Sequence, residues 1–246
     1  MRGRVKVGCC GIPIGLSRYA STFDVVELQQ TFYQPPAPST LAQWNKKVPG
    51  GFEFTLKAWQ LITHEASSPT YRRLREKLDE RQRREAGSFR STPVVMMAWR
   101  RTLDCARALG ARWILFQCPA RFTPTPENQA NLRRFFREIE PSRGRGAERL
   151  AYVWEARGEW KASDIRELCE ELDLVHGVDP FQQRPVTAGP AYFRLHGRTG
   201  YGYRYTETDL KQLLEKVRPF DSPYVFFNNI SMLEDARSFQ KLITGS

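Results

Sequence analysis

Three basic side chains stand at alternate positions in the stretch AYFRLHGR, which runs from Ala191 to Arg198. Arg194, His196 and Arg198 follow residues typical of a buried strand, in which successive side chains point to opposite faces. If the strand continues that far, all three side chains share one face. Because ionisable groups inside a buried strand are costly without partners or solvent, we expect them at a strand end that forms part of a site.

Polar residues also stand at the ends of almost all the other strand-like segments. In a parallel barrel the carboxyl ends of the strands meet at one mouth, where such folds place their ligands. We therefore predict that the polar side chains at these ends line one concave pocket. They are Glu27, Lys57, Gln117, Glu155, Arg157, Asp179, Arg194, His196, Asn228 and Asn229.

Eight short apolar or β-branched segments are the candidate strands. They are VKVGCCG near Val5, FDVVELQ near Val25, GFEFTLKA near Phe54, RWILFQC near Leu115, LAYVWEAR near Val153, LVHGVD near Val178, AYFRLHG near Phe193 and PYVFFNN near Val225. Amphipathic segments separate most of them, and this alternation is typical of a parallel sheet. Eight strands favour an α/β fold, a (β/α)8 TIM-like barrel that forms a single domain over residues 1–246, with some irregular or missing helices.

Start signals mark several expected helices. The expected caps or first residues are Ser39, Pro93, Pro126, Ser163 and Thr206. Gly110 is the expected stop of the helix that Pro93 opens. The first helix, 16–20, is short, and the segment PFQQRPVTAGP after Asp179 has no helical period, so we expect a loop there.

Composition restricts the class of protein. With 246 residues and 41% hydrophobic composition the chain can bury one substantial core, whereas its longest apolar runs are too short to cross a bilayer. No signal-like region precedes the first strand, so we expect a soluble, cytoplasmic protein with no membrane partner. The five cysteines lack metal-binding spacing and lie in apolar patterns, which favours buried structural thiols.

The chain is basic. Lys and Arg number 38 against 27 Asp and Glu, which gives a net charge of +11. This excess favours anionic partners, nucleic acid among them, without indicating a reaction. Part of the charge lies in YRRLREKLDERQRRE, residues 71–85, where acids are mixed with bases at helical spacing, so a solvated helix face is favoured over a nucleic-acid contact there.

The motifs together resemble those of the family called domain of unknown function 72 (DUF72), or YecE-like, barrels. The resemblance rests on VGCCG, FDVVELQQTFYQPP, GFEFTLKAWQLITH, ILFQCPARF, VWEARGEW, YFRLHGRTGYGYRY and VFFNN, and it extends from the first strand to the last helix. It implies a TIM-like barrel with a polar pocket at the strand carboxyl ends, and no settled reaction. Carried over residue by residue, it adds Tyr33, His64 and Arg198 to the strand-end residues.

Two chemical interpretations of the acidic residues stay open. Glu27, Glu155 and Asp179 could act as paired carboxylates in acid–base chemistry, because burial or mutual repulsion raises one pKa while a nearby arginine lowers another. Alternatively, they form an ion-pair network with neighbouring lysine and arginine side chains, which also perturbs pKa values. The residues expected to be catalytic are Glu27, Lys57, Glu155 and His196.

A metal site is a further alternative. Glu27, His64, Glu155, Asp179 and His196 would supply mixed oxygen and nitrogen ligands for a divalent ion. No compact HxH or HxxE pair supports such a site, and the nearby Lys and Arg residues would repel a cation. Because arginine binds phosphate and carboxylate in bidentate fashion, the same charge favours an anionic ligand over a metal.

An aromatic loop, YGYRY at residues 201–205, follows the seventh candidate strand. Tyr203 and its neighbours could close over a ligand and stack on a ring, or form a packed loop with no ligand.

Three classes of function are compatible with these residues. An enzyme that acts on a small anionic or phosphorylated substrate leads, and hydrolysis, isomerisation and elimination could all use these groups. A nucleic-acid-binding or phosphodiester-processing protein, with or without a divalent metal, is second. A ligand-binding protein without catalysis is third, and the sequence does not indicate an oligomeric state.

Overall fold

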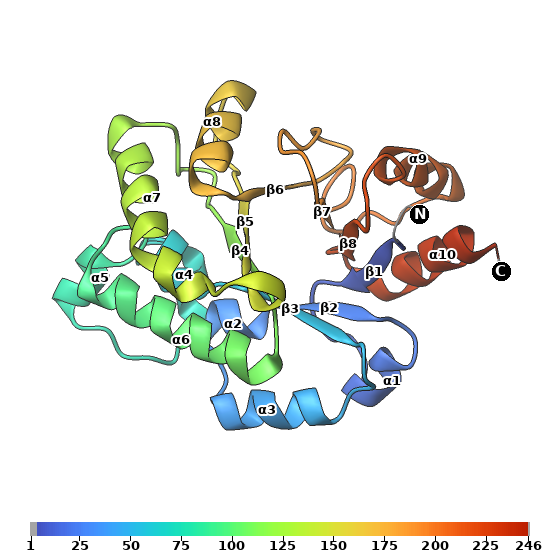
Figure 1. The fold of residues 1–246 in the computed structure, drawn as a ribbon, viewed down its shortest axis with the longest axis horizontal. Helices are drawn as coiled ribbons and strands as arrows, with labels where there is room; N and C mark the ends of the chain where they lie inside the picture. The colour runs from blue at the N-terminus through green and yellow to red at the C-terminus, as the bar shows by residue number, and fades with distance from the viewer. Residues whose placement is uncertain (1–3, 246) are drawn as a thin grey trace. The chain divides into compact units, whose positions relative to one another are not determined.

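Strands and helices alternate along the chain, as the sequence predicts (Figure 1). The computed structural model describes residues 4–245. Its strands are β1 Lys6–Cys9, β2 Val25–Leu28, β3 Glu53–Lys57, β4 Trp113–Gln117, β5 Ala151–Glu155, β6 Val175–Val178, β7 Tyr192–Leu195 and β8 Tyr224–Phe227. Each lies within one of the eight predicted segments.

The strands form one eight-stranded sheet in the order β1-β8-β7-β6-β5-β4-β3-β2. The registers of β1 with β8, β7 with β8, β6 with β7, β3 with β4 and β4 with β5 are all parallel. An isolated parallel bridge between Cys10 and Glu27 joins the two ends of this order. The fold is therefore a (β/α)8 TIM-like barrel, and the predicted fold class is confirmed.

The chain divides into two compact units, and each unit combines separate segments of the sequence. Unit 1 contains residues 4–27, Lys47–Glu53 and residues 175–245. Unit 2 contains Leu28–Lys46 and Phe54–Leu174. Neither unit is therefore one continuous stretch of sequence.

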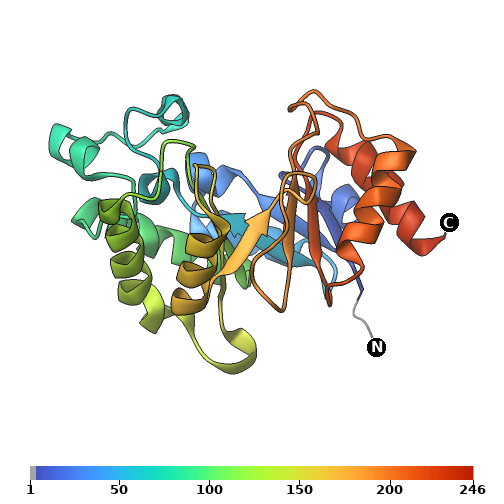
Figure 2. The same ribbon diagram turned by 90° about the horizontal axis from the view of Figure 1, so that it is seen from above.

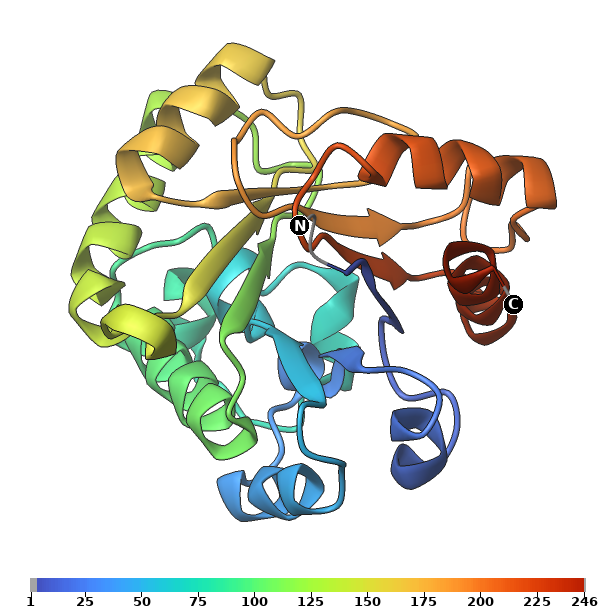
Figure 3. The ribbon, with the colours of Figure 1, turned by 45° about the vertical axis from the view of Figure 1, so that its right-hand side comes forward.

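Unit 1 is built around β1, β6, β7 and β8. Its helices are α1 Leu16–Ala20, α9 Glu207–Val217 and α10 Met232–Thr244. Helix α10 packs against β1, β8 and α9, as Figure 3 shows, and the Phe227 and Phe239 rings meet 5.9 Å apart in this interface. Tyr19 of α1 accepts a hydrogen bond from the Cys9 amide at 2.7 Å and donates one to the Val25 carbonyl at 3.0 Å, which fixes β1 against β2.

Unit 2 carries most of the helices. They are α2 Gln30–Tyr33, α3 Pro38–Lys46, α4 Gln60–Thr63, α5 Glu80–Glu85, α6 Pro93–Leu109, α7 Pro126–Ile139 and α8 Ala162–Leu172, with 3₁₀ turns η1 Pro69–Arg73, η2 Glu140–Arg143 and η3 Gly146–Glu148. Helix α6 packs against α3, α4 and α5, and α7 lies beside α8 (Figure 2). Phe116 of β4 lies 5.0 Å from the ring of Phe136 and 5.7 Å from that of Tyr152, so aromatic packing joins this part of the sheet to α7.

Four predicted helix signals, at three helices, are confirmed. Helix α6 begins at Pro93 and is capped after Leu109 by Gly110, which has the positive φ of 63° that glycine adopts readily. Helix α7 begins at Pro126. Thr206 caps α9 in a capping box with Asp209.

The two predicted serine caps are wrong. Helix α3 begins at Pro38, so Ser39 lies inside its first turn. Proline is favoured at a first helical position because that position needs no backbone N–H. Helix α8 begins at Ala162, and the Ser163 hydroxyl instead hydrogen-bonds the carboxylate of Asp164 at 3.1 Å.

The charged segment 71–85 is helical only at its ends. The turn η1 ends at Arg73, and α5 starts after its cap, Asp79. Helix α5 buries no side chain, so its charged residues are solvated as predicted. The connection between β6 and β7 contains no helix, which also agrees with the sequence.

All five cysteines are buried thiols. Burial raises the pKa of Cys9 and of Cys169 to about 12 and that of Cys105 to about 11, so these side chains stay protonated and apolar.

Among the helices of residues 4–245, none has both the length and the apolar content that a bilayer span requires.

Candidate functional site

Three polar side chains end consecutive strands of unit 2. Lys57, Gln117 and Glu155 are the last residues of β3, β4 and β5, and the register aligns Gln117 with Glu155. The Lys57 ammonium donates to Gln117 Oε1, and Gln117 Nε2 donates to Glu155 Oε1 at 3.1 Å. Arg157 Nε contacts the same Glu155 oxygen at 2.9 Å. These four residues are called the strand-end cluster below.

The strand-end cluster is buried on one side and accessible on the other. Lys57 and Glu155 are 6% and 3% exposed, whereas the Arg157 side chain is 41% exposed. The Lys57 ammonium lies 3.7 Å from the ring centre of Phe32, where the aromatic face stabilises its charge. The backbone of Lys57 is held in place as well, since the Thr31 hydroxyl donates to the Lys57 carbonyl at 2.8 Å.

His64 lies near this cluster in the uncharged form. Burial, followed by the positive charges of Lys57 and Arg121, lowers its pKa to about 3. Its Nδ1 is hydrogen-bonded to the Thr63 hydroxyl at 2.8 Å, and its ring packs edge-on against Phe32 at 5.0 Å. At neutral pH His64 therefore contributes a neutral imidazole.

Tyr33 follows Phe32 at the end of α2. The Arg73 guanidinium lies 3.6 Å from the centre of the Tyr33 ring, a cation–π contact that fixes both side chains. Gln60 Nε2 also donates to the Tyr33 carbonyl at 2.9 Å. Tyr33 is thus held in place within unit 2, next to Phe32, the residue whose ring contacts the Lys57 ammonium.

A second group of predicted residues lies at strand ends in unit 1. Asp179 follows β6, His196 follows β7 and Asn228 follows β8. Asp179 Oδ2 accepts from the His196 backbone amide at 3.0 Å, and Asn228 Nδ2 lies 3.0 Å from His196 Nδ1. These contacts fix the position of the imidazole.

Glu27 and Arg194 form a fully buried ion pair. Both side chains are 0% exposed, and Arg194 donates from Nε and Nη2 to the carboxylate at 2.9 Å. The Tyr192 hydroxyl donates to the same carboxylate at 2.7 Å. This geometry favours the ion-pair interpretation for Glu27 and Arg194, because the guanidinium is engaged by the carboxylate.

The condition under which Arg194, His196 and Arg198 would share one strand face is not met. Strand β7 ends at Leu195, and Gly197 turns the chain with a φ of 84°. A Cβ at Gly197 would lie 2.1 Å from the Gly200 carbonyl oxygen, so the turn requires glycine. Beyond the turn Arg198 contacts Asp209 at 2.6 Å.

The loop after β7 is packed by hydrogen bonds. Tyr203 donates to Asp209 at 2.7 Å, and Asn229 Nδ2 donates to the Tyr203 carbonyl at 2.7 Å and to Asp235 at 2.6 Å. Asn229 is 0% exposed, whereas Asn228 is only partly buried. Asn229 therefore stabilises the loop.

Comparison with known proteins places these features in a family. Residues 13–245 match the family model described as "Protein of unknown function DUF72". The chain belongs to the DUF72 family. The resemblance inferred from the sequence motifs is thereby confirmed.

Proteins similar to this DUF72 protein match it over most of its length. The UPF0759 protein YunF of Bacillus subtilis (strain 168) is 25% identical, over 88% of this chain and 80% of YunF. The crystal structure of a DUF72 protein from Enterococcus faecalis V583 is similar with a TM-score of 0.75 and 21% identity, over 100% of this chain and 99% of the other. A DUF72 protein from Thermotoga maritima MSB8 gives a TM-score of 0.65 and 22% identity, over 98% and 99% of the two chains.

The side chains of the described residues were also compared with the requirements of a metal site. Among residues 4–245 no group of three or more His, Cys, Asp or Glu side chains is placed to hold an ion. That all the predicted polar residues line one pocket stays a prediction.

Sequence reasoning missed the partners that hold the predicted residues. Phe32 under Lys57, Arg73 over Tyr33, and Asp209 and Asp235 in the loop of unit 1 were not identified. The stretch QTFYQPP contains both Phe32 and Tyr33, but an aromatic residue near a strand end does not indicate which cation it contacts. The capping-box role of Asp209 could have been predicted from the sequence, since Asp209 stands three residues after the cap Thr206.

Proposed function

We propose that this protein is an enzyme that acts on a small anionic substrate, preferably a phosphorylated one, and that its chemistry takes place at the carboxyl ends of β3, β4 and β5. The observation that carries the proposal is the strand-end cluster: one buried carboxylate connected to two cations. Enzymes with barrel folds place their active sites at strand carboxyl ends, which adds support by analogy.

Charge is the first argument for an anionic substrate. The cluster has two positive side chains, Lys57 and Arg157, and one negative, Glu155. His64 is neutral because of its low pKa, so it does not add a charge that a substrate must balance. Arg157 uses Nε for Glu155, and a guanidinium carries further N–H donors that suit phosphate or carboxylate oxygens.

The division of roles follows from the contacts. Glu155 is the group that transfers a proton, because it is the carboxylate of the cluster and two donors orient its Oε1. Lys57 stabilises negative charge that develops during reaction, since Phe32 and Gln117 hold its ammonium in place. Gln117 accepts a hydrogen bond from the ammonium and donates one to the carboxylate, and so links the two groups.

The test is a turnover screen with phosphorylated sugars, nucleotides and carboxylic acids, followed by ³¹P and ¹H NMR. We expect Glu155→Gln to lower kcat roughly 100-fold or more, the range of general acid–base contributions. Arg157→Ala should mainly raise KM. The matched control is Glu167→Gln on α8, whose carboxylate is exposed and paired with Arg133. Wild-type turnover that Glu155→Gln retains in full would refute the assignment.

Nucleic acid is the second candidate substrate class, and one surface feature favours it. Tyr201 and Ile230 are exposed by 58% and 69%, and their loops are joined by a hydrogen bond from the Ile230 amide to the Tyr201 carbonyl at 2.9 Å. An exposed tyrosine near exposed arginines can stack on an unpaired base. If this class is correct, single-stranded oligonucleotides bind with a steep salt dependence, and Tyr201→Ala weakens the binding.

A further inference from the structure

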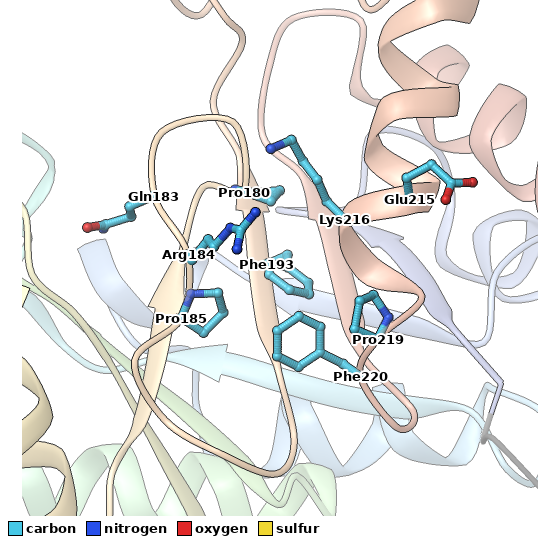
Figure 4. A pocket seen from close by; sticks show the side chains of 9 residues that line it. All are labelled: Pro180, Gln183, Arg184, Pro185, Phe193, Glu215, Lys216, Pro219 and Phe220. Atoms are coloured by element: carbon cyan, nitrogen blue, oxygen red, sulfur yellow. The ribbon is translucent and has the colours of Figure 1, made fainter.

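A cavity lies in unit 1 where the connection between β6 and β7 lacks a helix. In a regular barrel a helix would follow β6 and cover the outer side of the neighbouring strands. Here a proline-containing loop and the end of α9 take that place, and they enclose a cavity of about 420 Å³. Its lining includes Arg184, Phe193, Lys216, Phe220 and three prolines (Figure 4).

Rigid rings form the apolar part of this cavity. Phe193 of β7 and Phe220 after α9 meet edge-on, with ring centres 5.3 Å apart and an interplanar angle of 74°. Phe193 directly precedes Arg194, so the strand alternation directs it to the face opposite the buried ion pair. Three proline rings complete the apolar lining. Such a surface accommodates a flat ring better than a flexible chain.

The charged groups that face into the cavity are cationic. Figure 4 shows the side chains of Arg184 and Lys216 extending toward the end of the cavity at which Pro180 lies. The same view shows the Glu215 carboxylate pointing away from the cavity, where Arg218 contacts it at 2.6 Å. Within residues 4–245 neither Arg184 nor Lys216 has a carboxylate partner. The cavity therefore combines an aromatic lining with unbalanced positive charge.

We propose that this cavity binds a small aromatic anion, a planar ring that carries a carboxylate, sulfonate or phosphate group. The ring packs against Phe220 and the proline rings, beside the buried Phe193, and the anionic group binds Arg184 and Lys216. The volume of about 420 Å³ lies within the range of about 300–1,000 Å³ typical of ligand pockets. The site shares no residue with the strand-end cluster, so it is independent of the proposed reaction.

The probe for this site is naphthalene-2-sulfonate, titrated into the protein by isothermal calorimetry, with uncharged naphthalene-2-sulfonamide as the comparison. We expect one sulfonate to bind per chain, and the sulfonamide to bind at least about tenfold more weakly. The double variant Arg184→Ala/Lys216→Ala should weaken sulfonate binding at least about tenfold and leave sulfonamide binding unchanged. Both side chains are exposed, so the variant should fold.

Controls locate the bound probe. Lys211→Ala removes a cation from the same helix, α9, outside the cavity and should not change the affinity. Phe220→Ala should weaken the binding of both probes, with circular dichroism to verify its fold. Equal affinity for the two probes, unchanged binding by the double variant, or no binding at millimolar sulfonate would each overturn the proposal. So would loss of binding in Lys57→Met, since it would place the probe at the strand-end cluster.

Discussion

The substitution Glu27→Gln tests the buried ion pair most directly. It keeps the size and shape of the side chain, removes its charge and replaces one carboxylate oxygen by an NH₂ group. Arg194 Nε and Nη2 and the Tyr192 hydroxyl all donate to this carboxylate. In the variant a donor faces donors, and a guanidinium that is 0% exposed loses the charge that balances it.

The expected loss is large because solvent does not reach the site. Breaking a buried pair by removing one partner costs about 3–5 kcal/mol. For a protein of this size each kcal/mol corresponds to about 2–4 °C in Tm, so the melting temperature should fall by roughly 6–20 °C. Urea denaturation followed by circular dichroism measures the free energy of unfolding directly.

Two further variants decide how the result is interpreted. The double variant Glu27→Met/Arg194→Met replaces both charges with apolar side chains and should be more stable than Glu27→Gln alone. Glu207→Gln removes a carboxylate from an exposed pair with Lys211 and should leave the denaturation midpoint unchanged. A loss below about 1 kcal/mol for Glu27→Gln would show that the pair behaves like a surface ion pair and would refute the reasoning.

Three other predictions concern pH, a turn and a helix cap. The folded-state pKa of His64 is about 3, below the ordinary value of 6.5. Between these two pH values, unfolded chains bind a proton that folded chains do not. The stability present above pH 6.5 is therefore lost as the pH falls toward 3. The loss should be roughly 2–3 kcal/mol between pH 7 and 4.5 and smaller in His64→Gln, as urea titrations at each pH would show; equal losses would contradict the assignment. Gly197→Ala should lower the free energy of unfolding by about 2 kcal/mol or more because of the positive φ and the nearby Gly200 carbonyl. Gly202→Ala, with no atom within 4 Å of its Cβ, should be neutral. Similar thermal melts for the two variants would exclude the steric argument. Thr206→Ala should lower the free energy of unfolding by about 1 kcal/mol because the α9 capping box is lost. Thr206→Ser should retain most of that stability in the same assay. A serine variant as unstable as the alanine variant would argue against the cap.

The sequence predicted the elements whose signals are local. Buried strands appear as short apolar runs, and all eight were found within their segments. Pro93, Pro126 and Gly110 set helix ends because each restricts its own backbone. The caps at Ser39 and Ser163 failed because serine fits several positions of a first turn, so its presence does not fix the boundary.

Parts of the site that depend on strand ends were also predictable. Lys57, Gln117 and Glu155 end three consecutive strands, so their proximity followed from the order of the elements. The Glu27–Arg194 pair joins residues 167 positions apart, and its bidentate geometry depends on sheet register and burial, which no local motif encodes. The cation–π contact of Phe32 depends in the same way on how α2 is placed.

The pairing of β1 with β8 sets an order of events during synthesis. Lys6 of β1 aligns with Tyr224 of β8, 218 residues later in the chain. At about 5–20 residues per second, a ribosome needs roughly 10–45 s to make the intervening chain. Through that interval β1 has an unpaired edge, which in a nascent chain is a target for aggregation or chaperone binding. The β3–β4–β5 segment, in contrast, has all of its strands available once Glu155 has been made.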